Sequence, residues 1–171
     1  MHVKKDSPKL EPLRRAIDKS YENYDGQPIK WVRVHRNPDY AYFNHSAHLN
    51  RGIGCVSCHG RIDEMPVVYQ AEPHSMGWCL ECHDTRRGGL EKNLRPLEHV
   101  FDMDWEPADE DRNEFHQYVA GILGDVKANE LVPTEGDAAG TEMTQEEIGT
   151  ALKEAWKIHP PSPNNCAGCH R

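Results

Sequence analysis

Three copies of the motif Cys-x-x-Cys-His contain every cysteine of this 171-residue chain. The copies occupy Cys55–His59, Cys79–His83 and Cys166–His170. This motif is the attachment signature of c-type haem, in which two thiols form thioethers to the porphyrin and the adjacent histidine binds the iron. The sequence therefore predicts three covalently attached haem c groups. The predicted attachment residues are Cys55, Cys58, Cys79, Cys82, Cys166 and Cys169, and the predicted iron ligands are His59, His83 and His170.

Zinc binding and thiol redox chemistry are the competing interpretations of these cysteines. The first two pairs have spacing that suits a zinc ribbon, but zinc leaves Cys166 and Cys169 without a second pair. Histidine makes up 11 of 171 residues, so its chance occurrence after all three pairs has a probability of roughly 0.0003. Thioredoxin-like chemistry expects one such pair at a strand-to-helix turn, not three. The motif count therefore favours haem.

The composition indicates where the core of such a chain comes from. Only 37% of the residues are hydrophobic and 8% are aromatic, which is little core material for this length. A haem is a large, mostly apolar body that buries area as a core side chain does. We therefore expect a mainly α, loop-rich fold of the multihaem class III cytochrome c type, with short helices packed on three haems. On this view haem is the core, and the haem-free chain is largely unfolded.

The formal charge of -8 gives no support for nucleic-acid binding. No stretch approaches the roughly 20 apolar residues of a transmembrane helix, and no signal peptide follows Met1. Haem c is attached outside the cytoplasm, so we expect a periplasmic or extracytoplasmic protein. The expectation is that the true N-terminus, with an export signal or membrane anchor, precedes this sequence.

Hydrophobic periodicity and capping residues predict short helices separated by loops. The helices are expected over 7–24, 40–50, 112–123 and 144–159, the last opened by a capping box of Thr144 and Glu147. A weak extended segment is expected over 29–36, and loops over 51–100 and 129–143. Two regions result, residues 1–100 with two haem motifs and residues 101–171 with the third, which together form one continuous haem-cored domain.

The second axial position of each iron can be filled by a histidine outside the motifs. His45 and His48 stand three residues apart on a short predicted helix, so both side chains leave one face and can bind two different haems. The third ligand stays open between His74, His35 and Met76, a thioether ligand that raises the potential. The remaining histidines are interpreted as surface or packed residues: His2, His99, His116 and His159.

The segment Phe43–His48, followed by the first motif, resembles the small triheme class III cytochromes of the c-seven type. In that family the first histidine of such a pair binds the first haem and the second binds the haem of the next motif. The resemblance therefore implies the pairs His45 with His59, His48 with His83, and His74 with His170. Residues 84–165 depart from that pattern.

A second resemblance is to the pentahaem cytochrome subunit of alternative complex III, a bacterial quinol oxidoreductase. It is carried by Trp31–His35, Tyr42–His48, Cys58–Met65, Ser75–His83 and the C-terminal motif. Members of that family have two further haem motifs upstream, so the resemblance implies a truncated N-terminus. It also implies electron transfer from a quinol-oxidising membrane complex to other redox proteins, with no catalytic site in this chain. The alternative is an enzyme with one open-site haem that reduces nitrite, hydroxylamine or peroxide.

Overall fold

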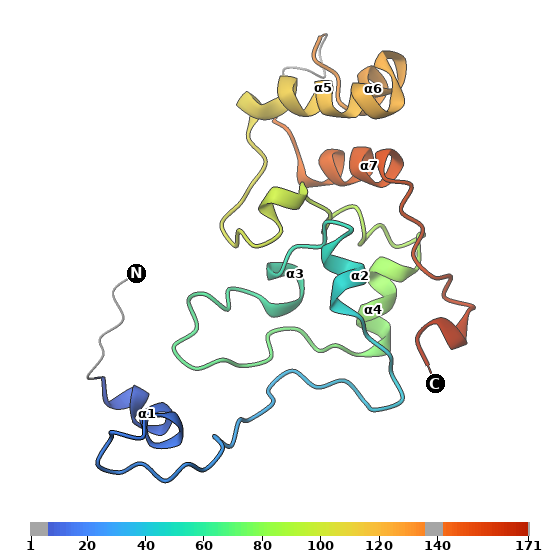
Figure 1. Cartoon of the computed structure of the whole chain (residues 1–171). Helices are drawn as coiled ribbons and strands as arrows, with labels where there is room; N and C mark the ends of the chain where they lie inside the picture. Colours follow the sequence, from blue (N-terminus) through green and yellow to red (C-terminus); the bar gives the residue numbers. More distant parts are fainter. Residues whose placement is uncertain (1–6, 136–141, 171) are drawn as a thin grey trace. The chain divides into compact units, whose positions relative to one another are not determined.

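The computed structural model describes residues 7–135 and 142–170 and is mainly helical, as predicted. In these residues the extended pairing consists of two isolated antiparallel bridges, Ala41 with His170 and Ile53 with Leu94. The chain divides into two compact units, Met1–Val34 and His35–Arg171 (Figure 1). The expected division near residue 100 stays a prediction.

The N-terminal unit contains a 3₁₀ turn, Pro8–Leu10, and the helix α1, Glu11–Ile17. The predicted helix over 7–24 is therefore wrong beyond Ile17. Asp18 adopts an extended conformation, and its carboxylate accepts hydrogen bonds from the backbone N–H and the hydroxyl of Ser20 at 2.9 and 2.6 Å. This local turn competes with the helix for the backbone. Residues 29–36 form no strand.

The segments around the first two motifs contain three short helices. These are α2, His45–Leu49, α3, Val56–His59, and α4, Met76–His83. The helix predicted over 40–50 is confirmed in its central part, where the Asn44 side chain caps α2 by accepting from the Ser46 N–H at 3.0 Å. The helix α4 lies in a region predicted to be mostly loops. None of the residues in these three helices is buried.

The C-terminal helices are α5, Arg112–Leu123, α6, Asp125–Leu131, and α7, Gln145–Ala155. The helix predicted over 112–123 is confirmed, and so is the capping box that opens α7. The loop predicted over 129–143 is wrong for residues 129–131, which end α6, and residues 136–141 lie outside the described part. The helix α7 ends at Ala155, before the predicted end at His159, and Lys157 then adopts a φ of 50°.

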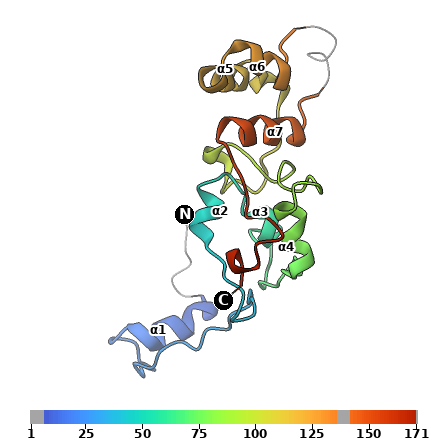
Figure 2. The same ribbon diagram turned by 90° about the vertical axis from the view of Figure 1, so that its right-hand side faces the viewer.

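An apolar core lies between these helices and the segment that follows the second motif. Its most deeply buried side chains are Leu94, Val119, Val132, Ile148 and Leu152. Figures 1 and 2 show α5 and α6 together on one side of α7, with the motif helices on the other. The helices α5, α6 and α7 bury apolar side chains of their own, so this half of the chain has a core of protein side chains, whereas a haem core around the motifs stays a prediction.

The backbone of α7 lies directly against the segment after the second motif. A Cβ at Gly149 would overlap the carbonyl oxygen of Glu91, so only glycine allows this approach. Lys153 forms an ion pair with Glu91, and the Gln145 side chain donates to the carbonyl of Leu94. The helix α7 therefore connects the apolar core to the part of the chain that carries the second motif.

Candidate functional site

The first two Cys-x-x-Cys-His motifs lie in α-helical turns, and the third contains a short 3₁₀ turn, Cys166–Gly168. The N–H of His59 donates to the carbonyl of Cys55 at 2.9 Å, and that of His170 donates to the carbonyl of Cys166 at 2.8 Å. The second motif completes α4. In one helical turn, side chains three and four residues apart share a face. Each motif therefore presents two thiols and one imidazole toward the same side.

The six cysteines have free thiols, and the three motifs lie near one another. Burial, followed by the neighbouring Cys82 and Cys79, raises the pKa of the Cys58 thiol to about 11. Burial, followed by nearby Cys169, also raises the pKa of Cys79. Cysteines of the second motif therefore lie near cysteines of both the first and the third motif. Reactive thiols require a lowered pKa, so these shifts disfavour thiol redox catalysis.

Two pairs of histidines face each other across short gaps. The ring centroids of His45 and His59 are 6.3 Å apart with an interplanar angle of 6°. Those of His48 and His83 are 6.0 Å apart with an angle of 61°. The structure thus brings together two of the three ring pairs that the c-seven resemblance implies.

The spacing of these pairs fits a metal ion held between two imidazoles. With metal–nitrogen bonds of about 2 Å, the centroids of two such rings lie about 6 Å apart. Among the described residues, no group of three or more His, Cys, Asp and Glu side chains is arranged to hold a metal ion. A haem iron needs only two axial ligands from the protein, so pairs are the arrangement to expect. The residues present therefore fit haem at the first two motifs.

Hydrogen bonding and burial affect the protonation of these imidazoles. Nδ1 of His48 lies 2.8 Å from the carbonyl oxygen of Asn44, which can only accept. Nδ1 therefore carries the proton, and Nε2 keeps its lone pair for a metal. Burial and then nearby His48 lower the pKa of His83, against an opposing effect of the Pro161 carbonyl. Burial likewise lowers the pKa of His59. Neutral imidazole is the form that binds metal.

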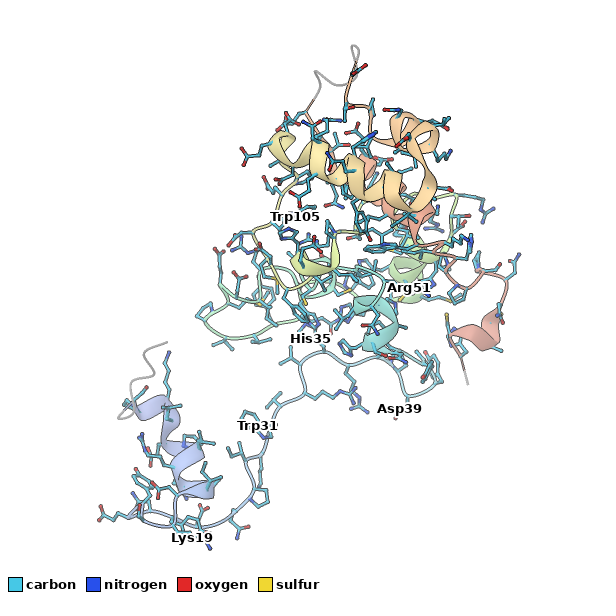
Figure 3. The ribbon with its side chains drawn as sticks, turned by 45° about the horizontal axis from the view of Figure 1, so that its top comes forward. Lys19, Trp31, His35, Asp39, Arg51 and Trp105 are labelled. Atoms are coloured by element: carbon cyan, nitrogen blue, oxygen red, sulfur yellow. The ribbon has the colours of Figure 1, made fainter. Side chains whose placement is uncertain are left out.

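His35 and His74 both lie at the first motif. Nε2 of His35 is 3.3 Å from Nδ1 of His59, and the rings of His35 and His74 are 5.6 Å apart (Figure 3). Nε2 of His74 donates to the carbonyl of Cys58 at 3.1 Å, and the backbone of His74 adopts a φ of 47°. The contact between His35 and His59 spans 24 residues, and no sequence pattern signals it. The pairing of His74 with His170 stays a prediction.

The third motif is held by the segment that precedes α2. The N–H of Tyr42 donates to the carbonyl of Cys169 at 2.7 Å, and Ala41 forms the bridge with His170. The ring of Tyr40 lies 5.7 Å from that of His170, at an interplanar angle of 28°. Sequence reasoning missed Tyr40, because tyrosine before a haem motif carries no spacing signal.

Met76 and the remaining histidines occupy distinct environments. Met76 begins α4 and is 60% exposed. His99 stacks on Trp105 at 5.1 Å, and His116 Nδ1 donates to the carbonyl of Val132 at 2.7 Å. His159 is exposed beyond the end of α7. His2 lies outside the described residues.

No protein-family model matches this sequence, and no curated protein is significantly similar to it. In the part of the chain that the structure describes, no helix is both long and apolar enough to cross a bilayer.

Proposed function

We propose that this chain is a multihaem c-type cytochrome that transfers electrons through three covalently attached haems. The observation that carries the proposal is the pair of facing imidazole couples, His45 with His59 and His48 with His83, at 6.3 and 6.0 Å. Each couple joins one motif histidine to one histidine of α2. Haem supplies reversible one-electron chemistry at its iron when bound.

The residues of the chain have distinct roles in this proposal. The six cysteines anchor the cofactors, and His59, His83 and His170 are the proximal ligands. His45 and His48 are the second ligands of the first and the second site. Because both belong to α2, they keep these two sites close together. Two strong axial ligands leave little to rearrange when the oxidation state changes, which suits electron transfer.

Exposed apolar side chains near the motifs support the proposal. The helix α2 and the motif helices α3 and α4 bury none of their own residues. The exposed apolar residues of this region are Tyr40, Tyr42, Phe43, Val67, Val68, Tyr69 and Met76. Apolar surface of this kind is stabilised when a large apolar cofactor covers it. The expected fold of short helices packed on haem belongs to this proposal.

The second axial ligand of the third site is His74 or Met76. The hydrogen bond of His74 to Cys58 and its approach to His35 tie it to the first motif. Met76 precedes Cys79 by three residues on α4, so the two side chains share a face, and Cys79 neighbours Cys169. These contacts favour Met76, whose thioether would raise the potential of that haem.

The proposed partners follow from the resemblance to the cytochrome subunit of alternative complex III. They are subunits of a quinol-oxidising membrane complex and the redox proteins that accept its electrons. The proposed location is outside the cytoplasm, at a membrane through these partners. The chain itself would then be an electron-transfer subunit without a catalytic site.

A haem count and single histidine variants test this proposal. The pyridine haemochrome of protein made in a haem c-competent host is expected to show three covalent haems, with low-spin spectra. His45→Ala and His48→Ala are each expected to turn one low-spin haem high-spin. His159→Ala is the matched control, because His159 is exposed beyond α7, and it should change nothing. A protein without covalent haem would refute the proposal.

An enzyme with one open haem site is the second candidate function. It is favoured by the ring that faces His170, which is Tyr40 rather than a histidine. An iron without a strong second ligand can bind a small substrate such as nitrite, hydroxylamine or peroxide. Rapid carbon monoxide binding to one haem of the reduced protein would support this candidate, and three unreactive haems would exclude it.

A further inference from the structure

Arg95 is a buried cation next to the first motif. Only 7% of its surface is exposed, and its backbone N–H donates to the carbonyl of Gly52 at 2.9 Å. Its side chain crosses over Gly54, where an added Cβ would lie 2.5 Å from Nε of Arg95. Gly54 immediately precedes Cys55, the first attachment residue. The guanidinium is therefore packed against the backbone next to the residue that would attach the first cofactor.

Among the described residues, no carboxylate contacts this guanidinium directly, and Asp102 compensates its charge only in part from a longer distance. Nη1 donates to the backbone carbonyl of Asp102 at 2.8 Å, and the guanidinium carbon lies 5.2 Å from the ring centre of Trp105. Nε is buried without a hydrogen-bond partner. A buried charge without a contacting carboxylate is costly, because it loses hydration without gaining a direct ion pair.

The other arginines near this motif have different surroundings. Arg61 forms ion pairs with Asp63, Glu64 and Asp104 at 2.7–3.0 Å, so its charge is balanced locally. Arg51 is exposed to solvent and makes a long contact of 3.5 Å with the carbonyl of Trp156 (Figure 3). Water and salt weaken the field of an exposed charge much more than that of a buried one.

We propose that Arg95 raises the reduction potential of the haem at the first motif above that of the haem at the second motif, which has the same kind of imidazole pair. Oxidation adds one positive charge at the iron, and a nearby buried cation opposes that change. A unit charge about 10 Å away, at an effective dielectric constant of about 20, changes the ratio of reduced to oxidised haem by about tenfold. The first haem would then accept electrons from the second. This inference rests on the proposed function.

A redox titration followed by absorbance tests the inference on the haem-loaded full chain. In Arg95→Gln, one of the three components is expected to shift downward, so that its ratio of reduced to oxidised haem at a fixed ambient potential falls about tenfold. Arg95→Lys keeps the charge and is expected to retain most of the potential. Arg51→Gln removes an exposed charge near the same motif and is the control, with little shift expected. An unchanged titration in Arg95→Gln, or equal shifts in the Gln and Lys variants, would overturn the inference.

A second variant keeps the test decisive if Arg95→Gln does not fold. The double substitution Cys55→Ala and Cys58→Ala removes the first haem and leaves Arg95 in place. The component lost from the titration is expected not to be the one with the lowest potential, and loss of the lowest-potential component overturns the inference. The haem count separates the two proposals, because failure of the proposed function means no covalent haem, whereas failure of this inference leaves three haems with unshifted potentials.

Discussion

Replacing Gly149 with alanine tests how the apolar core is joined to the segment that carries the second motif. A Cβ at this position would overlap the carbonyl oxygen of Glu91, which belongs to the backbone and cannot rotate away. The helix α7 would have to move, and this would loosen the contacts of Ile148 and Leu152 with Leu90 and Leu94. Gly121 in α5 is the matched control, because nothing lies within 4 Å of a Cβ built there.

The two substitutions are expected to have effects of opposite sign. Alanine is better than glycine inside a helix by roughly 0.5–1 kcal/mol, and both variants gain this amount. Overpacking typically costs about 1–3 kcal/mol, and more where backbone must move. Gly149→Ala should therefore lower the free energy of unfolding by about 2 kcal/mol, whereas Gly121→Ala should raise it by roughly 0.5–1 kcal/mol.

Urea unfolding followed by far-ultraviolet circular dichroism measures both changes on the same chain. The difference in the free energy of unfolding between the two variants is more informative than either value alone, because helix propensity contributes equally to both. A Gly149→Ala protein as stable as Gly121→Ala would refute the close approach of α7 to Glu91. It would then also refute the idea that this helix anchors the second motif.

Three further predictions concern the cap of α2, the core and the haem-free chain. Asn44→Ala removes the cap of α2 and should cost about 1 kcal/mol of stability, measured by urea unfolding, with Asn50→Ala as a control that leaves the cap intact. Val119→Ala should lower the free energy of unfolding by about 2 kcal/mol, because Val119 is 0% exposed. Val126 is 87% exposed, so Val126→Ala is the control and should leave the stability unchanged. Equal thermal stabilities of the two variants would contradict the described core. A chain with all six cysteines changed to alanine should keep the helical dichroism of α5–α7, while limited proteolysis cuts around α2–α4; complete loss of helix would show that haem is the whole core.

Local sequence patterns predicted the elements whose causes are local. The stripe over 112–123 and the Thr144–Glu147 capping box specify α5 and the start of α7, because propensity, capping and apolar spacing agree there. The helix predicted over 7–24 ran too far because the Asp18 carboxylate turns the chain earlier. Periodicity alone also missed α4 and α6.

The candidate site likewise has features that local sequence predicts and features that only the folded chain provides. The proposed attachment cysteines and motif histidines can be identified from the sequence because haem attachment requires this spacing, and the i, i+3 spacing of His45 and His48 predicts that they share a face. The distances of these two histidines to His59 and His83 depend on how α2 lies against α3 and α4. Only the folded chain provides them.

The linear sequence determines the anchoring chemistry of this chain, since two thiols and an imidazole within five residues need only one helical turn to act together. Tertiary structure decides which side chains approach those turns from elsewhere. His35 contacts His59 although 24 residues separate them, and Tyr40 contacts His170 although the two are far apart in the sequence. Arg95 becomes a buried cation close to Cys55. Such contacts depend on packing between distant segments, because a residue's burial and neighbours are properties of the whole fold and not of its local spacing.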